Sequence, residues 1–400
     1  MNATIREKLL VQEEMLEIAK SKAQLIIGLP MESSFQENRI VLIPDAVKTL
    51  VKQGHQVLVQ RNAGVASHFP DHEYSEAGAR VCESVQEILQ ADVVLKVSPV
   101  SERELMLMKG KQFLISALHL KIQNRNYFQG LMQKKISAMA FEFIKDKTNA
   151  SPVVRSISEI VGSASIHIAA EYLSHPDFGN GQMLGGFTGI APSVVVIVGA
   201  GTVGEYAARM AISMGAAVKV FDNNVYKLRR LKSEVGQGLF TSTLQTAELQ
   251  KAIRSADVLI CAVHAKFHQS PVLITEEMVA SMKQGSVIVD VSIDQGGCVE
   301  TSRITSHDKP VFNVHGVTHY CVTNIASRFP NTASIALSNF FAPMLIKAGE
   351  LGGIEKLLLH DLYFRQGLYT YHGILTNKII GDYFGLPYQD MDLLLSLIHI

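Results

Sequence analysis

A glycine pattern between two apolar runs places the strongest constraint on how this chain folds. Residues 193–222 read SVVVIVGAGTVGEYAARMAISMGAAVKVFD. Val194–Val198 is an unbroken β-branched run, which is typical of a strand buried on both faces. Gly199, Gly201 and Gly204 follow with G-x-G-x-x-G spacing and lead into a helix-compatible segment. With a strand before it and a helix after it, the pattern indicates a dinucleotide-binding βαβ unit.

Each part of this pattern has a physical task. The first glycine permits a tight turn, the second lets the backbone approach a pyrophosphate, and the third lets the helix lie close to the strand. Thr202 and Val203 begin the helix, whose free N–H groups can bind phosphate. The second β-rich run ends at Asp222, whose carboxylate can accept hydrogen bonds from both ribose hydroxyls. We therefore predict an NAD site; the alternative is a glycine-rich turn with a purely structural use.

The cofactor choice rests on charge at the end of the second run. The Asp222 carboxylate should repel the 2′-phosphate of NADP, so NAD is the predicted cofactor. Lys227, Arg229 and Arg230 lie shortly after it and keep NADP as an alternative.

Length and composition limit the class of protein. Four hundred residues exceed one ordinary core, so two domains are expected. The formal net charge is zero, which gives no indication of a nucleic-acid or anionic-membrane partner, and no apolar run reaches the roughly 20 residues of a membrane span. The cysteines lack metal-like spacing, so we predict no metal site and reduced thiols in a cytoplasmic protein: Cys82, Cys261, Cys298 and Cys321.

Strands and helices alternate on both sides of the glycine pattern. Before it, strands are expected from Gln24, from Gln56, and at 93–97, 113–117 and 136–144, with helices at 44–53 and 158–173. After it, we expect helices at 227–234, 244–255 and 333–348, strands at 257–263 and 286–291, and a helical tail after Gly353. This alternation predicts an α/β protein with parallel sheets.

The domain boundaries follow from this alternation. We expect a helical extension at residues 1–22 and an NAD-binding domain with a Rossmann doubly wound parallel sheet at 153–330. Residues 23–152 and 331–400, from both chain ends, should form a second α/β domain of flavodoxin-like or Rossmann-like type that supplies substrate groups.

Four side chains are candidates for binding or proton transfer. Lys96 lies near the end of the run VVLKV, and His119 follows the run FLISAL, where ligands gather in open α/β sheets. Alternatives remain open for each of them. Lys96 could be an edge-strand lysine that reaches water, and His119 could be a hydrogen-bonded core histidine. Arg39 could be an ordinary solvated arginine, and Asp294 a turn residue.

Several longer motifs resemble the alanine dehydrogenase family, which includes the NAD-binding subunit of proton-translocating transhydrogenase. The resemblance covers residues from about 24 to 390. Its motifs are PMESSFQENRI, AGVASHFPDHEYSEAGA, VLKV, ALHL, SISEIVG, MLGG, VVVIVGAGTVG, VDVSIDQGGCVE, VHGVTHYCVTN and TASIALSN. IDQGGCVE and YCVTN resemble the dehydrogenase branch most specifically.

The resemblance implies a role for several residues on the substrate side. Arg39 and Lys96 match the residues that hold the substrate carboxylate and carbonyl, and His119 matches the general acid/base. Asp294 and Asn324 match residues beside the substrate and the nicotinamide.

On the cofactor side, the resemblance adds two residues to the glycine pattern. Ser158 matches a serine that contacts the cofactor, and Lys227 matches a lysine near its adenosine end.

The implied reaction is the reversible, NAD-dependent oxidative deamination of L-alanine to pyruvate and ammonium. His119 would have to be neutral in the oxidative direction, so the rate should rise with pH. The resemblance also implies a homo-oligomer, hexameric in many members, with only small-molecule partners. The chain departs from the family pattern near Lys96, Ser163, His264 and Ile325. Two alternatives therefore remain: a dehydrogenase for another amino or oxo acid, and a non-catalytic NAD(H)-binding subunit.

Overall fold

The computed structural model describes residues 22–34, 36–236, 238–264 and 270–398. The chain divides into two compact units: unit 1 comprises Met1–Val154 and Pro330–Ile400, and unit 2 comprises Arg155–Phe329. Residues 1–21 of the predicted N-terminal helical extension lie outside the described residues. No helix in the described ranges combines the length and the apolar character that a membrane span needs.

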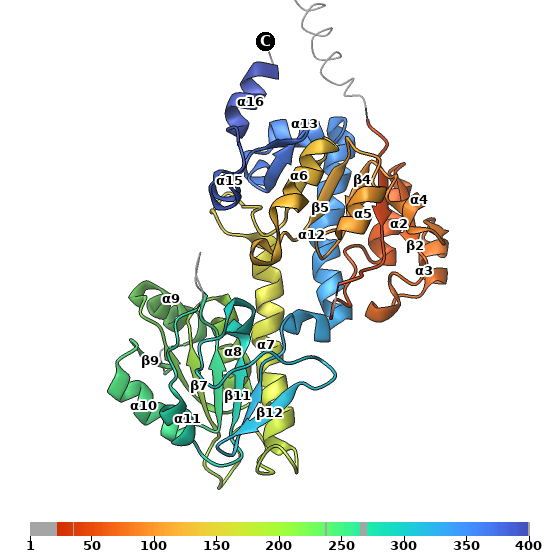
Figure 1. Cartoon of the computed structure of the whole chain (residues 1–400). Helices are drawn as coiled ribbons and strands as arrows, with labels where there is room; N and C mark the ends of the chain where they lie inside the picture. Colours follow the sequence, from red (N-terminus) through yellow and green to blue (C-terminus); the bar gives the residue numbers. More distant parts are fainter. Residues whose placement is uncertain (1–21, 35, 237, 265–269, 399–400) are drawn as a thin grey trace, which may run out of the picture. The chain divides into compact units, whose positions relative to one another are not determined.

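An eight-stranded sheet forms the centre of unit 1, in the order β15-β14-β6-β5-β4-β1-β2-β3. Figure 1 labels its strands β2, β4 and β5. Its first six strands along the chain are parallel to one another: β1 (Ile26–Leu29), β2 (Gln56–Gln60), β3 (Arg80–Cys82), β4 (Val93–Leu95), β5 (Phe113–Ser116) and β6 (Ser137–Ala140). Their order, 3-2-1-4-5-6, is that of the dinucleotide-binding fold rather than the flavodoxin order. Of the two predicted types, unit 1 is therefore Rossmann-like.

Two strands of unit 1 come from the tail after Gly353, which the sequence predicts as helical. β14 (Leu368–Tyr371) pairs antiparallel with β6, and β15 (Ile374–Leu375) pairs antiparallel with β14. The prediction is wrong here because only His372 and Gly373 separate the strands. Both adopt positive φ, at 48° and 82°, as a two-residue hairpin requires.

The helices of unit 1 include α2 at Pro44–Lys52, where Pro44 takes the predicted first-turn position. α5, α6 and α15 contribute side chains to one apolar core with the sheet. The bounds of the other helices are α3 (Asp71–Glu76), α4 (Val85–Ile88), α5 (Glu102–Leu107), α6 (Arg125–Gln133), α12 (Pro330–Leu351), α13 (Ile354–His360), α14 (Leu362–Arg365), α15 (Lys378–Phe384) and α16 (Met391–Ile398).

Unit 2 contains a seven-stranded sheet in the order β12-β13-β11-β10-β7-β8-β9. The strands are β7 (Val194–Val198), β8 (Ala217–Phe221), β9 (Phe240–Ser242), β10 (Val258–Cys261), β11 (Val287–Asp290), β12 (Val311–Val314) and β13 (Val317–Tyr320). Only β12 is antiparallel to its neighbour, so the other six form the doubly wound order again. The predicted Rossmann sheet is confirmed.

Alternate residues of β7 pack into different cores, as its apolar run predicts. Val195 and Ile197 join side chains of α7 (Pro152–Ser174), α8 (Thr202–Ser213) and α9 (Val225–Val235). Val196 and Val198 join side chains of α10 (Thr246–Ser255) and α11 (Glu276–Ala280). Helices therefore cover both faces, and the ligand-binding positions are the loops at the strand ends.

Candidate active site

Unit 1 gathers charged side chains where its strand order reverses. β1 and β4 are parallel neighbours at the centre of the sheet. From β1 the chain continues to β2 on one side, and from β4 it continues to β5 on the opposite side. Such a switch point is where open α/β sheets bind ligands. Glu32 follows β1, and Lys96 follows β4 directly, so both side chains reach this position from adjacent strand ends.

Lys96 is fully buried and held by carboxylates. Its Nζ lies 2.6 Å from Oε1 of Glu104 and 3.9 Å from Oε2 of Glu32. β4 lies between β1 and β5, so the alternative of an edge-strand lysine that reaches water is wrong. A buried ammonium group needs such counter-ions, because an unpaired charge in the interior is costly.

Glu104 is fixed by the start of helix α5. Its Oε2 accepts hydrogen bonds from the backbone N–H and Oγ of Ser101, at 2.7 and 2.9 Å, while Ser101 caps the helix in return. The capping box thus holds one carboxylate oxygen still while the other faces the Lys96 ammonium group.

Glu32 accepts hydrogen bonds from the backbone N–H groups of Val97, at 2.6 Å, and Ser98, at 3.3 Å, and from the Ser98 hydroxyl. Its side chain is only 6% exposed. Burial raises the pKa of Glu32 to about 7, and the nearby Glu37 carboxylate adds to the rise, whereas Lys96 and the hydrogen bonds lower the pKa. These opposing effects leave the pKa of Glu32 near neutral pH.

Arg39 forms a buried bidentate pair with Glu37. Its Nε donates to Oε1 at 2.8 Å and its Nη2 to Oε2 at 2.7 Å. α12 fixes the following backbone, since Ile40 N donates to Ser334 Oγ at 2.9 Å and Ile43 N to Ser338 Oγ at 2.8 Å. The alternative of an ordinary solvated arginine is wrong.

His119 is exposed and lies beyond the end of β5, the neighbour of β4. Its backbone has a φ of 50°, and the N–H groups of Leu118 and His119 donate to Oε1 of Glu142 at 2.8 and 3.1 Å. Oε2 of Glu142 is buried and has no hydrogen-bond partner within the described ranges. The core-histidine alternative is wrong, because the ring stands at a strand-end loop that Glu142 anchors.

In unit 2, two of the fingerprint glycines are required by backbone packing. A Cβ at Gly199 would lie 2.3 Å from the Ala262 carbonyl oxygen, and φ is 111° there. A Cβ at Gly204 would lie 1.9 Å from the Gly199 carbonyl oxygen, so α8 can approach β7 only with glycine at this position. Gly201 differs, because its Cβ would meet no atom within 4 Å. The open side at Gly201, at the start of α8, fits a pyrophosphate, as the fingerprint predicts.

Asp222 follows β8 and lies beside this turn. Its Oδ2 accepts a hydrogen bond from Ala200 N at 2.8 Å, and its Oδ1 accepts one from Asn224 N at 2.7 Å. The half-exposed Lys227 places its Nζ 3.9 Å from Oδ2. The carboxylate thus links the glycine turn to the start of α9, where an adenosine ribose is bound in this fold.

Two of the basic residues that left NADP as an alternative cofactor have their side chains in contact with other residues. Arg230 Nη2 lies 3.3 Å from Oε2 of Glu205, and Arg229 lies over the Tyr226 ring. The structure engages both side chains in other contacts, which favours NAD.

Ser158 lies half-buried on α7, which begins at Pro152, earlier than predicted. One turn later, a Cβ at Gly162 would lie 2.4 Å from the Val203 carbonyl oxygen. α7 therefore packs closely against the start of α8, and Ser158 precedes this contact on the same helix.

Asp294 and Asn324 are brought together from two loops. Asp294 lies in the 3₁₀ turn Val291–Gln295, and Asn324 precedes the turn Ile325–Arg328 with a φ of 57°. Asn324 N donates to Asp294 Oδ1 at 3.2 Å. Asp294 is exposed, so its carboxylate remains accessible to a ligand.

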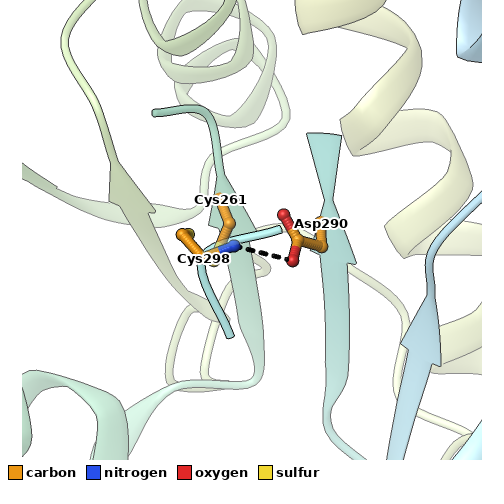
Figure 2. A group of neighbouring side chains, drawn as sticks. All are labelled: Cys261, Asp290 and Cys298. Carbon is orange, nitrogen blue, oxygen red and sulfur yellow. Dashed lines mark hydrogen bonds between the residues drawn. The ribbon is translucent and has the colours of Figure 1, made fainter. Parts of the chain in front are cut away.

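A buried cluster anchors the loop that carries Asp294 (Figure 2). Cys261 and Asp290 end β10 and β11, and with Cys298 they place potential metal-ligand atoms within 4.8 Å of one another. The wide sequence spacing of these cysteines does not predict this grouping. Asp290 Oδ1 accepts from Ser292 N at 3.0 Å, and Oδ2 accepts from Cys298 N at 3.2 Å and from Ser302 Oγ at 2.7 Å.

These contacts indicate a structural role for the cluster. Its hydrogen bond with Cys298 and its burial raise the pKa of the Cys261 thiol, and burial raises the pKa of Asp290. Since both Asp290 oxygens already accept hydrogen bonds from the following loop, we assign the cluster to loop anchoring rather than to metal binding.

A cavity of about 660 Å³ also lies in unit 1, lined by the 144–147 loop and by side chains of α12, α13 and α14. None of the candidate residues lines it.

The sequence interpretation assigned no role to Glu32, Glu37, Glu104 or Glu142. Glu32 and Glu142 follow β1 and β6, so the strand-end argument applied to Lys96 and His119 would have found both. The Ser-x-x-Glu pattern ending at Glu104 predicts a helix cap but not the ion pair with Lys96.

Comparisons with known proteins give one consistent family. Residues 28–161 match the family model described as Alanine dehydrogenase/PNT, N-terminal domain, and residues 165–378 match Alanine dehydrogenase/PNT, C-terminal domain. The alanine dehydrogenase of Bacillus subtilis is 38% identical over 91% of this chain and 96% of its own length. That of Mycolicibacterium smegmatis is 35% identical over 92% and 98%.

Solved structures agree with these matches. An L-alanine dehydrogenase has a TM-score of 0.84 and 37% identity, over 90% of this chain and 99% of its own. A transhydrogenase from Sinorhizobium meliloti has a TM-score of 0.75 and 25% identity, over 88% and 99%.

Proposed function

Since the chain belongs to the alanine dehydrogenase/PNT family, we propose that it catalyses the reversible NAD-dependent oxidative deamination of L-alanine to pyruvate and ammonium. The observation that carries this proposal is the buried Lys96 at the switch point of unit 1, in a chain that also has a buried Arg39 and, in unit 2, the NAD fingerprint. Two fixed cations suit a small carboxylate substrate.

The residues of unit 2 fit NAD. The open side of Gly201 and the first N–H groups of α8, at Thr202 and Val203, would hold the pyrophosphate. Asp222 would bind the adenosine ribose, with Lys227 at the adenosine end and Ser158 as a further contact. When bound, NAD⁺ accepts the hydride that leaves C2 of alanine.

Arg39 and Lys96 would bind the carboxylate of alanine and orient C2. Their positions are fixed by Glu37 and Glu104, so little side-chain freedom is lost when the substrate binds. In the reverse direction the same cations would polarise the carbonyl group of pyruvate.

His119 would take the proton from the substrate nitrogen as the hydride leaves. It would release that proton to solvent and then remove a proton from the water that adds to the imine carbon. It would pass this second proton to the nitrogen and take up the hydroxyl proton as ammonia leaves and the carbonyl group forms. Asp294 and Asn324, joined by a hydrogen bond, would contact the substrate and nicotinamide. Because neutral imidazole is required for oxidation, the rate of alanine oxidation should rise with pH as His119 loses its proton.

A spectrophotometric assay of NADH formation across a panel of amino acids tests the proposal. We expect alanine to give the highest kcat/KM and His119→Ala to abolish the activity. His72→Ala, at an exposed histidine on α3, is the matched control and should retain it. A higher rate with another amino acid would indicate a different dehydrogenase, and NAD binding without oxidation of any amino acid would favour a non-catalytic subunit.

We further propose that the protein is cytoplasmic and forms a homo-oligomer of six subunits. Light scattering of the purified chain would test the number of subunits.

A further inference from the structure

The cavity of about 660 Å³ in unit 1 has an apolar lining that is partly open to solvent. α12 supplies Phe340, Pro343 and Met344 to this lining, and α14 supplies Leu362 and Tyr363. Leu362 is 56% exposed and Tyr363 is 37% exposed. Apolar surface that lines a concave site and faces water is typical of a binding surface for another apolar group.

Lysines outnumber aspartates around the cavity. The charged residues that line it include Lys145, Lys147, Lys347, Asp146 and Asp361. Both aspartates have partners, since Asp146 Oδ1 accepts hydrogen bonds from the backbone that follows it and Asp361 Oδ2 lies 3.3 Å from Lys347 Nζ. Lys147 is exposed and forms no ion pair in the part of the chain that the structure describes. The cavity therefore suits an apolar group that carries negative charge at its edge.

The sequence before Lys22 has both properties. When residues 5–18 are placed on a helix at about 100° per residue, most of their apolar side chains fall on one half of it. These side chains are Ile5, Leu9, Val11, Met15, Leu16 and Ile18. Glu13 falls beside one edge of this half and Glu14 beside the other, whereas Leu10 falls on the opposite half.

The described part of the chain begins beside the helix that lines the cavity. Ala23 N donates to the Gly349 carbonyl oxygen of α12 at 2.9 Å, and Lys347 on the same helix lines the cavity. Gly349 packs against His55, so the chain before Ala23 has to pass around α12 to reach the cavity. A helix is about 10 Å in diameter, and residues 19–22 span about 13 Å when extended. Residues 5–18 can therefore reach the cavity of their own chain.

We propose that residues 5–18 bind in this cavity as an amphipathic helix, with their apolar half against α12 and α14. The helix would cover Leu362 and Tyr363 and bring an acidic side chain to Lys147. This inference goes beyond the proposed function, because none of the residues assigned to alanine or NAD lines the cavity. It also concerns a part of the chain outside the family match, which begins at residue 28.

Hydrogen exchange of the full chain, followed by mass spectrometry, tests the proposal. We expect peptides from residues 5–18 to be protected in the unchanged chain. Leu16→Asp should speed their exchange at least ~tenfold, because it places a charge in an apolar contact. Leu10→Asp is the matched control, since it makes the same substitution on the opposite half of the predicted helix, and it should change the exchange by less than about twofold.

A pair of variants on the cavity side makes the test reciprocal. Leu362→Asp should speed the exchange of residues 5–18 by a similar factor, because this exposed side chain lines the cavity. Ile379→Asp, at an exposed apolar position on α15 outside the cavity, should leave the exchange unchanged.

Two results would overturn the proposal. One is exchange of residues 5–18 in the unchanged chain at the rate of an unstructured peptide, a measurement that does not depend on the folding of any variant. The other is protection of these residues that Leu362→Asp leaves intact, since they would then bind another surface of this chain or a second copy. Neither result depends on the oxidation of alanine, so the proposed function is tested separately.

Discussion

The buried carboxyl group of Glu32 should make the stability of unit 1 depend on pH in an unusual direction. Its pKa is about 7 in the folded chain, against an ordinary value of 4.5. Between these values the unfolded chain releases a proton that the folded chain keeps. The free energy of unfolding should therefore fall as pH rises through this window, whereas a carboxylate in a favourable ion pair gives the opposite slope.

The size of the effect follows from the pKa difference. At about 1.36 kcal/mol for each pKa unit, a rise from 4.5 to about 7 corresponds to roughly 3 kcal/mol, fully developed above pH ~7. This loss should be absent in Glu32→Gln. Relative to the unchanged chain, the variant should therefore gain about 2.5 kcal/mol between pH ~5 and pH ~8.

Hydrogen exchange followed by mass spectrometry offers a local assay, because a chain with two units need not unfold in one step. Peptides covering β1 and β4 report the opening free energy beside Glu32, and peptides covering β7 in unit 2 serve as the internal control. Both proteins are compared at equal pH, which cancels the intrinsic exchange rate. A stability difference that stays constant with pH, or one that develops equally in β7, would refute the reasoning.

Three further predictions concern the ion pair and the NAD fingerprint. Lys96→Met should destabilise unit 1 by about 3–5 kcal/mol because it leaves Glu104 unpaired, and Lys96→Met with Glu104→Gln should recover most of this in thermal denaturation; no recovery would contradict the ion-pair argument. Gly201→Ala should preserve the melting temperature in scanning calorimetry and weaken NAD binding in titration calorimetry by about tenfold, about 1.4 kcal/mol. Gly204→Ala should lower both the melting temperature and the NAD affinity, because its Cβ would lie 1.9 Å from a backbone oxygen. Asp222→Ala should raise the NADP⁺ to NAD⁺ ratio of kcat/KM by about tenfold, since a negative charge is removed; an unchanged ratio would argue against ribose recognition there.

The fold was predictable where local pattern and tertiary environment agree. The β-branched run of β7 and the spacing of Gly199 and Gly204 reflect burial and close approach, both of which the structure contains. β14 and β15 were missed because short strands joined by His372 and Gly373 carry little periodicity. Their identity as strands depends on pairing with β6, which is distant in the sequence.

In the candidate site, too, local sequence pattern predicted some features, while others depend on contacts between distant parts of the chain. Position after a strand predicted that Lys96 and His119 lie beyond strand ends, and they follow β4 and β5. Their part in ligand binding stays a prediction. The partners of Lys96 could not be read from spacing, because Glu32 and Glu104 meet it through the strand order and a helix cap. The sequence also did not predict that Cys261 and Cys298 lie together, because Cys261 ends β10 while Cys298 reaches it on the loop that follows β11.

The arrangement of the chain also affects the order in which its parts can form during synthesis. Unit 2 is one continuous segment, whereas unit 1 needs residues from both sides of it. Ile40, beside Arg39, is held by Ser334, 294 residues later, and β6 needs its partner β14 from the tail. Since contiguous domains generally fold as units during synthesis, we expect the nascent chain to acquire the capacity to bind NAD while the backbone at Arg39 still lacks its support. A truncation after unit 2 would thus resemble a natural intermediate, competent for nucleotide but not for substrate.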